Sequence, residues 1–387
     1  MKLNYKPKVF IFIDWFLPGY KAGGPVRSIA NMIELLSDFI DFSVITTTKD
    51  RGEQQPYPDI QADVWIYKEN FRIMYISKPS LLKMREVCKR EEIDIAYFNS
   101  VYSFFFTMIP LVLCKFSRPD TKIILAPRGM LQQGALSVKA FKKKLFIRFI
   151  KTFHIFKNIH WHATDNQEKK DIEHIFGAGG KVVVTQNIPA LFNEQISFIP
   201  KNKKPLRLVT ISLITAKKNI LATLKALQLL EKDFEVEYDL YGPVKDTAYW
   251  QKCQQQINLL NSNITVSYKG DVHPLQVNAT LQQYHFFVLP SLGENFGHAI
   301  YESLNAGRPV IISNLTPWKN LKAQQAGWDI DIRVDSALLN VIKECGYMEQ
   351  STFDELCRGA QGVAKKFIAE SNFISDYQQL FNNFHSI

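Results

Sequence analysis

One stretch, residues 286–313 (FFVLPSLGENFGHAIYESLNAGRPVIIS), restricts the fold of this chain more than any other. It begins with an apolar run, 286–289, and ends with a second one, 310–312, which is entered through a proline. Small and apolar residues recur between the two runs at helical spacing: Ala299, Ile300, Ser303, Leu304 and Ala306. Gly307 stands where such a helix would end. Two buried strands joined by a helix are the unit of a parallel α/β sheet, in which ligands bind at the carboxyl ends of the strands.

The loop of this unit, residues 293–297, lies at that position. Gly293 and Gly297 permit a close approach of the backbone to a ligand, and amides at the start of the following helix can bind an anionic phosphate. Glu294 belongs to the loop, while Glu302 lies about five residues into the helix, roughly 7.5 Å further along its axis. Carboxylates accept pairs of hydroxyl hydrogen bonds. The pattern therefore predicts a site for a ligand that carries both phosphate and hydroxyl groups.

Glu294 and Glu302, with seven residues between them, form an E-x7-E motif within PSLGENFGHAIYESLNAGRPVII. This stretch resembles the retaining glycosyltransferases of family 4, which have the GT-B fold. The resemblance implies that Glu294 contacts the hydroxyls of the donor sugar and that Glu302 binds the ribose. It also implies that the amides of Asn295, Phe296 and Gly297 meet the diphosphate. The alternative is an ordinary strand–helix–strand unit with two surface glutamates, and the context of strand, glycine loop and helix favours the site.

The N-terminal half predicts a parallel, doubly wound sheet, because strand-like runs alternate with helical patterns. The runs cover residues 9–12, 42–46, 71–76, 93–98 and 122–125, and the last strands of this half are expected within 162–168 and 182–187. Gly23 and Gly24 follow the first run and enter a helix near Val26, which is a cradle of the phosphate-binding type. They match the glycine loop in the N-terminal domain of the family.

The fifth run leads into Pro-Arg-Gly-Met-Leu, where Arg128 stands at a position that is a histidine in many members of the family. The resemblance implies a catalytic contribution of Arg128 through hydrogen bonds to a donor or acceptor group, without acid–base chemistry. The alternative is a structural arginine in a turn.

The C-terminal half repeats the alternation, with strand-like runs at 206–211, 236–241 and 264–268. We expect a first domain over residues 1–190, a turn-rich linker over 191–205, and a second domain over 205–371. By resemblance to GT-B proteins, the final helix, 372–387, crosses back and completes the first domain. The expected fold is therefore two Rossmann-like domains, the second of which holds the nucleotide-sugar.

One basic position departs from the family. There, an arginine and a lysine about five residues apart follow the first strand of the second domain and hold the donor diphosphate. Lys218 matches the lysine, and Leu213 occupies the place of the arginine. The loss of a guanidinium removes a bidentate phosphate contact, a difference of about 1.5 to 3 kcal/mol. Lys217, Arg128 and Arg27 are the cations that could compensate.

Residues 139–157 predict a basic amphipathic helix within a stretch, 121–164, that has no Asp or Glu. Its large apolar residues fall on one side at 100° per residue: Phe141, Leu145, Phe149, Phe153 and Phe156. A helix of this kind lies on an anionic membrane or packs in the core with a solvated basic face. Packing is the favoured interpretation, because membrane helices of this pattern are rarer. The apolar stretch 101–116 is too short to span a bilayer and predicts a buried helix.

The composition limits the partners, metals and cofactors that we expect. The chain has 387 residues and a formal charge of +10, which favours acidic partners such as nucleotides or lipid headgroups. Its five cysteines are scattered without metal-ligand spacing and indicate free thiols in a reducing cytosol. Asp329-Ile-Asp331 is a chance match to a metal-binding motif of another glycosyltransferase class. We expect no metal, no cofactor and no nucleic acid partner, since no RNA- or DNA-binding signature occurs.

The resemblance predicts a retaining glycosyltransferase in the cytoplasm, with a nucleoside-diphosphate sugar as donor and a saccharide or lipid-linked acceptor. The resemblance also implies a role in bacterial surface polysaccharide biosynthesis. The basic helix adds the expectation of a peripheral position at the inner face of the plasma membrane. The alternative is a non-catalytic subunit that binds nucleotide-sugar or acts as a scaffold, suggested by Leu213 and Arg128. The interpretation as a nucleic-acid-binding protein is supported by the positive charge alone.

Overall fold

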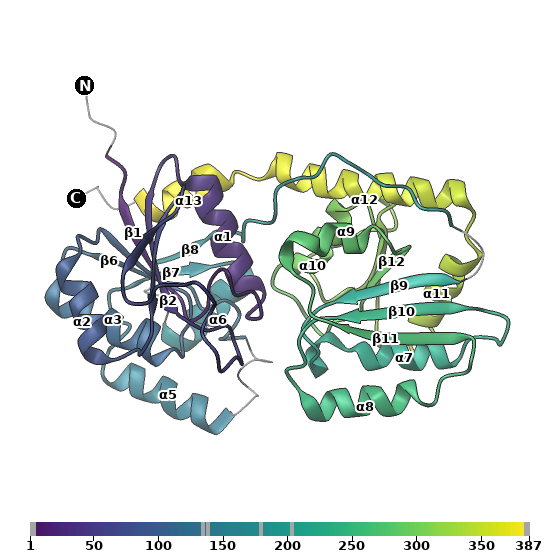
Figure 1. Cartoon of the computed structure of the whole chain (residues 1–387), viewed down its shortest axis with the longest axis horizontal. Coiled ribbons are helices and arrows are strands. Elements are labelled where there is room, and N and C mark those ends of the chain that lie inside the picture. Colours follow the sequence, from purple (N-terminus) through teal and green to yellow (C-terminus); the bar gives the residue numbers. More distant parts are fainter. Residues whose placement is uncertain (1–4, 133–135, 137–139, 178–180, 202–204, 383–387) are drawn as a thin grey trace. The chain divides into compact units, whose positions relative to one another are not determined.

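The computed structural model describes residues 5–132, 136, 140–177, 181–201 and 205–382. The chain divides into two compact units (Figure 1). The first consists of Met1–Ile188 together with Asn372–Ile387, and the second of Pro189–Ser371. The C-terminal segment therefore returns to the unit that contains the N-terminus.

The first unit is built on an eight-stranded sheet with the order β3-β4-β2-β1-β5-β6-β7-β8. Its strands are β1 (Lys8–Phe12), β2 (Asp41–Thr47), β3 (Trp65–Tyr67), β4 (Arg72–Ile76), β5 (Ile95–Phe98), β6 (Lys122–Leu125), β7 (His160–Ala163) and β8 (Lys181–Val184). The short edge strand β3, which the sequence did not predict, is antiparallel to β4, and the other described pairs are parallel. Strand order reverses between β1 and β5, as in doubly wound folds.

Helices cover both faces of this sheet. On one face α2 (Leu81–Arg90), α3 (Ile109–Ser117) and α6 (Asn166–Phe176) contribute to the core. On the other face lie α1 (Gly24–Leu36) and α13 (Phe373–Asn382). The Phe381 ring of α13 contacts Phe42 and Tyr97 at centroid distances of 6.4 and 5.6 Å. Helix α13 thus completes the first unit through aromatic packing.

The second unit has a six-stranded sheet in the order β11-β10-β9-β12-β13-β14, with every described pair parallel. The strands are β9 (Leu206–Ile211), β10 (Val236–Tyr241), β11 (Ile264–Gly270), β12 (Phe286–Leu289), β13 (Val310–Ser313) and β14 (Gly327–Ile330). This is the 3-2-1-4-5-6 order of the Rossmann fold. Strands β12 and β13 are buried along their whole length, and β9 is buried except at Arg207, which explains their apolar sequences, whereas β10 alternates between buried and more exposed residues and β11 is mostly more exposed.

The two faces of this sheet carry separate helices (Figure 1). One face packs against α7 (Ile220–Gln228), α8 (Thr247–Ile257) and α11 (Ala337–Tyr347). The other packs against α9 (Val277–Leu281), α10 (His298–Asn305) and the middle of α12 (Gln350–Glu370). The strand–helix–strand unit predicted from residues 286–313 is therefore β12–α10–β13, at the centre of the domain.

The described residues of the expected linker, 191–201 and 205, belong to the second unit. Arg308 explains part of this, because its side chain is fully buried and its guanidinium donates to the Ser197 carbonyl. Asn193 N also donates to Asn305 Oδ1 at 2.8 Å. A buried guanidinium requires acceptors, and the segment supplies one. The turn-rich composition gave no sign of this attachment.

Three local expectations differ from the structure. The helix expected over 139–157 is α5 (Ala140–Thr152), followed by turns. Residues 166–168, expected near a strand, begin α6, because Asp165 accepts a hydrogen bond from the Glu168 amide and caps the helix. Residues 101–116 form a π-helix, Phe104–Met108, and then α3, with the Phe104 and Phe116 rings exposed at 63% and 84%.

The prediction that the apolar side of the amphipathic helix packs in the core is wrong. Of its predicted apolar side, Phe156 is buried, whereas Phe141, Leu145, Phe149 and Phe153 are 81%, 60%, 50% and 65% exposed. Ile150 and, in part, Phe146 face the core instead. The helix rests on its unit through a narrow strip that lies beside the phenylalanine stripe. Periodicity alone could not tell which of the two apolar strips was buried.

A buried chain of polar groups crosses the carboxyl ends of β5 and β7. Arg128 Nη2 donates to the Tyr97 hydroxyl at 2.8 Å, and this hydroxyl lies 2.6 Å from His162 Nδ1. His162 Nε2 lies 2.8 Å from the Thr185 carbonyl. A carbonyl can only accept, so Nε2 carries the proton and Nδ1 accepts from Tyr97. Burial, with the nearby Arg128, lowers the pKa of His162 from 6.5 to about 3.

This histidine makes the stability of the first unit dependent on pH. Its folded pKa lies below the unfolded value, so the unfolded chain takes up the proton first. The contribution is full above pH 6.5 and is lost as pH falls toward 3. We expect the free energy of unfolding to fall about 2 kcal/mol further between about pH 6.5 and about pH 5 in the wild type than in His162→Gln. Chemical denaturation measures this, and equal slopes for the two proteins would contradict it.

Candidate functional site

The strand order of the second unit reverses between β9 and β12, which are paired neighbours. Loops that leave adjacent strands at such a point run to opposite faces, and ligands bind there. The loop after β9 carries Lys218, and the loop after β12 carries Glu294. The fold thus brings together two residues that the sequence placed in separate motifs.

Lys218 and Glu294 form an ion pair, with 2.6 Å between Nζ and Oε1. Both side chains are largely buried, at 19% and 10% exposure. The Lys217 carbonyl joins the two loops, because it accepts the Leu292 amide at 2.8 Å and the Ser291 hydroxyl at 3.1 Å. The separation of the two charged groups is therefore set by backbone contacts and not by flexible side chains alone.

The loop of residues 293–297 is shaped by its two glycines. Gly293 has φ of 149° and Gly297 has φ of 79°, both in regions that other residues avoid. Gly297 is the N-cap of α10, and its carbonyl accepts the amides of Ile300 and Tyr301 at 2.9 and 3.1 Å. The helix therefore begins directly at the end of the loop. Glu302 is its fifth residue and is half-buried.

Phe296 anchors the same loop in the core and is 8% exposed. Its ring lies 5.6 Å from the rings of Trp318 and Phe367 and 6.1 Å from Tyr301. The Trp318 indole donates to the Phe296 carbonyl at 2.7 Å. The expected role of Phe296 as a donor contact is thus limited to its backbone. The sequence gave no hint of Trp318, which lies far along the chain from this loop.

Leu213 lies in the loop after β9, where the family has its arginine, and is half-buried. This loop runs close to the end of β10, since a Cβ at Gly242 would lie 2.0 Å from the Ser212 carbonyl oxygen. Lys217 is the nearby cation, and burial lowers its pKa while Glu294 partly offsets this effect. Asn219 follows with φ of 56°, a left-handed conformation that lets helix α7 start immediately.

In the first unit, the donors of Arg128 bind other side chains. Its Nε lies 3.1 Å from Asn99 Oδ1, and Nη1 donates to Asn187 Oδ1. The next residue, Gly129, donates its amide to the fully buried Glu168. These contacts support the alternative that Arg128 is a structural arginine in a turn. The sequence analysis did not identify Asn99 or Glu168 as part of this arrangement.

Gly23 and Gly24 lie at the start of α1, with φ of 80° at Gly23 as the N-cap. Asp50 holds the loop before them by accepting the amides of Tyr20 and Lys21 at 2.9 and 3.1 Å. The glycine pair therefore occupies the carboxyl end of β1, beside the reversal of strand order in this sheet.

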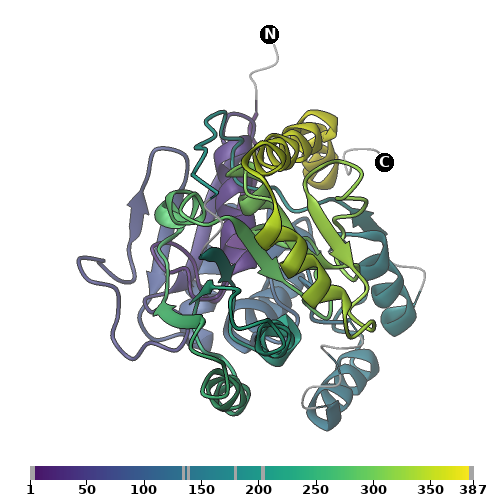
Figure 2. The same ribbon diagram turned by 90° about the vertical axis from the view of Figure 1, so that its right-hand side faces the viewer.

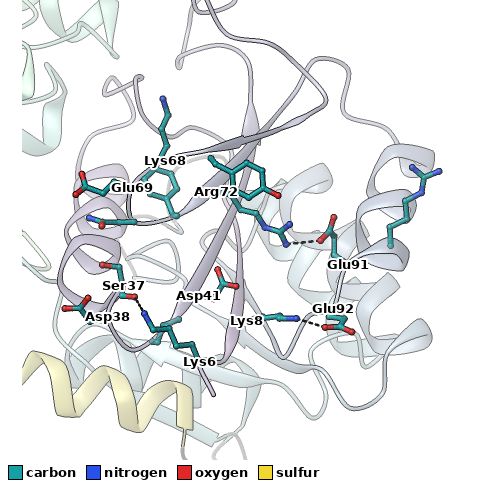
Figure 3. A pocket seen from close by; sticks show the side chains of 15 residues that line it. Lys6, Lys8, Ser37, Asp38, Asp41, Lys68, Glu69, Arg72, Glu91 and Glu92 are labelled. Carbon is teal, nitrogen blue, oxygen red and sulfur yellow. Dashed lines mark hydrogen bonds and ion pairs between the residues drawn. The ribbon is translucent and has the colours of Figure 1, made fainter. Parts of the chain in front are cut away.

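A hollow of about 820 Å³ lies at the opposite, amino-terminal edge of the first sheet. Its walls alternate in charge, and Figure 3 shows Lys8 directed at Glu92 and Arg72 at Glu91, with ion pairs of 2.5 and 2.8 Å. Since these charges neutralise one another and the hollow lies away from the carboxyl ends of the strands, it does not match the predicted donor site.

Among the described residues, no cluster of three His, Cys, Asp or Glu side chains has the geometry to hold a metal ion. The five cysteines are free and buried. Asp329, half of the chance motif, accepts the Asn320 and Leu321 amides at 3.1 and 2.9 Å and serves a turn.

Comparisons with known proteins bear on the family of the second unit and on the fold of the whole chain. The family model described as Glycosyl transferases group 1 matches residues 192–327, the part of the second unit that contains Leu213, Lys218, Glu294 and Glu302. Residues 192–327 are therefore similar to the group 1 glycosyl transferases. No curated protein matches the chain. The resemblance drawn from the E-x7-E stretch is confirmed at the level of group 1, and membership of family 4 stays a prediction.

Solved structures extend the likeness to the whole chain. Sucrose-phosphate synthase from Thermosynechococcus elongatus is 14% identical, with a TM-score of 0.72 and coverage of 98% of this chain and 99% of that one. HepE of Anabaena, in complex with UDP-glucose, is 15% identical, with a TM-score of 0.69 and coverage of 98% and 100%. A glycosyltransferase from Rickettsia africae is 12% identical, with a TM-score of 0.65 and 98% coverage of both chains. The predicted GT-B fold is confirmed.

Leu213 gives the first test of the site. We expect Leu213→Arg to tighten the binding of a nucleoside diphosphate about tenfold, because it restores a charge-assisted contact to phosphate. Leu229→Arg, at a position 64% exposed on another loop, adds the same charge elsewhere and serves as the control. Titration calorimetry with UDP, GDP and ADP measures the affinities. A Leu213→Arg protein that unfolds, or that binds no more tightly than the control, would show that Leu213 does not occupy the arginine position.

Proposed function

We propose that this protein transfers a glycosyl group from a nucleoside-diphosphate sugar to a hydroxyl of a saccharide or lipid-linked acceptor, with retention at the anomeric carbon. The observation that carries the proposal is the Lys218–Glu294 ion pair at the strand-order reversal of a group 1 domain. The proposal includes a cytoplasmic location, no essential metal and a place in bacterial surface polysaccharide biosynthesis.

The ion pair is suited to exchange partners when a donor binds. Lys218 Nζ would leave the Glu294 carboxylate for oxygens of the diphosphate, and Glu294 would then accept hydrogen bonds from the sugar hydroxyls. Because both side chains are largely buried, the new contacts form in a region of low dielectric constant and are strong. Backbone amides of residues 295–297 and the N-terminus of α10 would complete the phosphate site.

The reaction breaks the bond between the anomeric carbon and the diphosphate oxygen and forms a bond from that carbon to the acceptor oxygen on the same face. The acceptor proton passes to the leaving diphosphate. Lys218 stabilises the charge that develops on the diphosphate, while Glu294 and Glu302 hold the sugar and the ribose in place. Arg128 is proposed to position the first unit's loop through Asn99 and Tyr97, in place of direct contact with the reacting atoms.

A second candidate is a non-catalytic subunit that binds nucleotide-sugar. Leu213 favours it, because an arginine is missing from the phosphate site, and so do the occupied donors of Arg128. Incubation with a panel of nucleotide sugars separates the two. UDP-glucose is the first member to test, because the similar HepE protein binds it. Release of nucleoside diphosphate supports the enzyme, and binding without release supports the subunit.

The carboxylate of Glu294 gives the sharpest test of the enzyme. We expect Glu294→Gln to reduce turnover by about 100-fold or more, the size found for a lost electrostatic contact in a transition state. The glutamine keeps the shape and can still accept a hydrogen bond from Lys218, so the thermal midpoint should stay close to that of the wild type. Glu237→Gln, at an exposed position of β10, is the matched control. Near-normal turnover by Glu294→Gln would remove Glu294 from the site.

A further inference from the structure

Helix α5 exposes large apolar side chains on the surface of the first unit. Phe141, Leu145 and Phe149 follow one another at four-residue spacing and are 81%, 60% and 50% exposed, and Phe153 continues them at 65%. The rings of Phe149 and Phe153 lie 4.6 Å apart. Figure 1 shows α5 at the margin of its unit, and Figure 2 shows it there again from the side. Large apolar side chains that gather on one exposed face mark a site of contact with another molecule or a membrane.

A groove lies beside this apolar ridge, between α5 and α6. Its volume is about 400 Å³, and two apolar residues, Ile147 and Ile175, are among those that line it. Four other lining residues carry or can acquire positive charge: Lys144, Arg148, Lys151 and His174. Among the described residues that line the groove there is no carboxylate. A hollow lined by apolar and basic residues together fits a ligand that joins a phosphate to hydrocarbon.

The ridge and the groove belong to one surface of the helix. At 100° per residue, Lys144, Arg148 and Lys151 flank the arc of Phe141 and Leu145 on one side, while Ile150 faces the core. Residues 121–164 contain no Asp or Glu, so α5 itself carries no negative charge, while Asp171 and Glu173 belong to the neighbouring α6. Apolar side chains next to a basic row are the arrangement of a helix that lies in a membrane interface.

We propose that this surface docks the first unit on an anionic phospholipid bilayer. The Phe141–Leu145–Phe149 ridge enters the boundary between headgroups and acyl chains, and the α5–α6 groove holds a lipid phosphate among Lys144, Arg148 and Lys151. No helix in the described part of the chain has the length and apolarity to cross a membrane, so the contact is interfacial. The inference supplies a structural basis for a peripheral location and is independent of the proposed glycosyl transfer.

The composition of the surface favours a lipid over a nucleic acid or a free anion. Nucleic acid would use the basic row but leave the apolar ridge in water, and a free phosphate would do the same. A bilayer covers both parts, and each basic side chain near an anionic leaflet strengthens binding about fivefold. Binding of this kind weakens with salt, because the surface field is screened within roughly 8 Å at physiological ionic strength.

The experiment is flotation of the full chain with vesicles of phosphatidylcholine alone or mixed with phosphatidylglycerol, at low and high salt. The wild type should float with the mixed vesicles at low salt and much less in the other conditions. Lys144→Glu/Arg148→Glu/Lys151→Glu should lower the partition coefficient by about 100-fold or more. The control Lys225→Glu/Lys232→Glu/Lys252→Glu changes the net charge equally at exposed positions of the second unit, and it should bind the vesicles like the wild type.

The apolar ridge is tested by a separate variant with its own matched control. Phe141→Ser/Leu145→Ser should reduce flotation at least tenfold, whereas Leu229→Ser/Leu275→Ser, which removes two apolar side chains that are 64% and 88% exposed in the second unit, should not. If the triple charge reversal lowers the thermal midpoint, Lys144→Gln replaces it, with an expected loss of about fivefold.

Three results would overturn the proposal: wild-type protein that ignores mixed vesicles at low salt, equal losses in the α5 variants and their controls, or displacement from vesicles by millimolar inorganic phosphate, which would identify a site for free phosphate. Flotation does not depend on turnover. A protein that floats but transfers no sugar would therefore contradict the proposed function alone, and one that transfers sugar to a soluble acceptor but never floats would contradict this inference alone.

Discussion

The Lys217 carbonyl is the contact on which the candidate site depends. It accepts hydrogen bonds from Leu292 and Ser291, and so fixes the loop after β9 to the loop after β12. Two loops that leave neighbouring strands toward opposite faces would otherwise move apart. Their attachment brings the ammonium of Lys218 to the carboxylate of Glu294 in a largely buried environment. In the proposed function, Glu294 keeps the buried Lys218 ammonium paired, and a bound diphosphate would replace that partner.

The first unit stabilises its own loop in a different way. Arg128 is held by Asn99, Tyr97 and Asn187, and the hydrogen-bond chain continues through His162 to the backbone. Burial of these polar groups is tolerated because each of these contacts pairs a donor with an acceptor. The loop after β6 is therefore set by the interior of its unit. An arginine at this position acts as part of the protein framework, which separates it from the acid–base chemistry that a histidine could perform.

Much of this arrangement could be predicted from the sequence. Continuous apolar runs identified the buried parallel strands, and the GENFG stretch predicted the loop and the helix that carry Glu294 and Glu302, because local spacing determines both. Phe296 and Trp318, Lys217 and Ser291, and Arg128 and Asn99 could not be paired in this way, since their contacts join residues far apart in the sequence. The exposed side of α5 could not be predicted either. Two apolar strips on one helix have the same period, and only tertiary packing decides which of them is buried.

The central claim is that Lys218 and Glu294 act together on one bound nucleotide-sugar. A double-mutant cycle measures this most directly: titration calorimetry of a non-transferable nucleotide-sugar analogue with the wild type, Lys218→Ala, Glu294→Gln and the double variant. Because the two side chains share a partner, we expect their effects on the binding free energy to be non-additive by about 1 kcal/mol or more, with Lys218→Ala losing most of the affinity. Equal affinity in all four proteins would contradict the account.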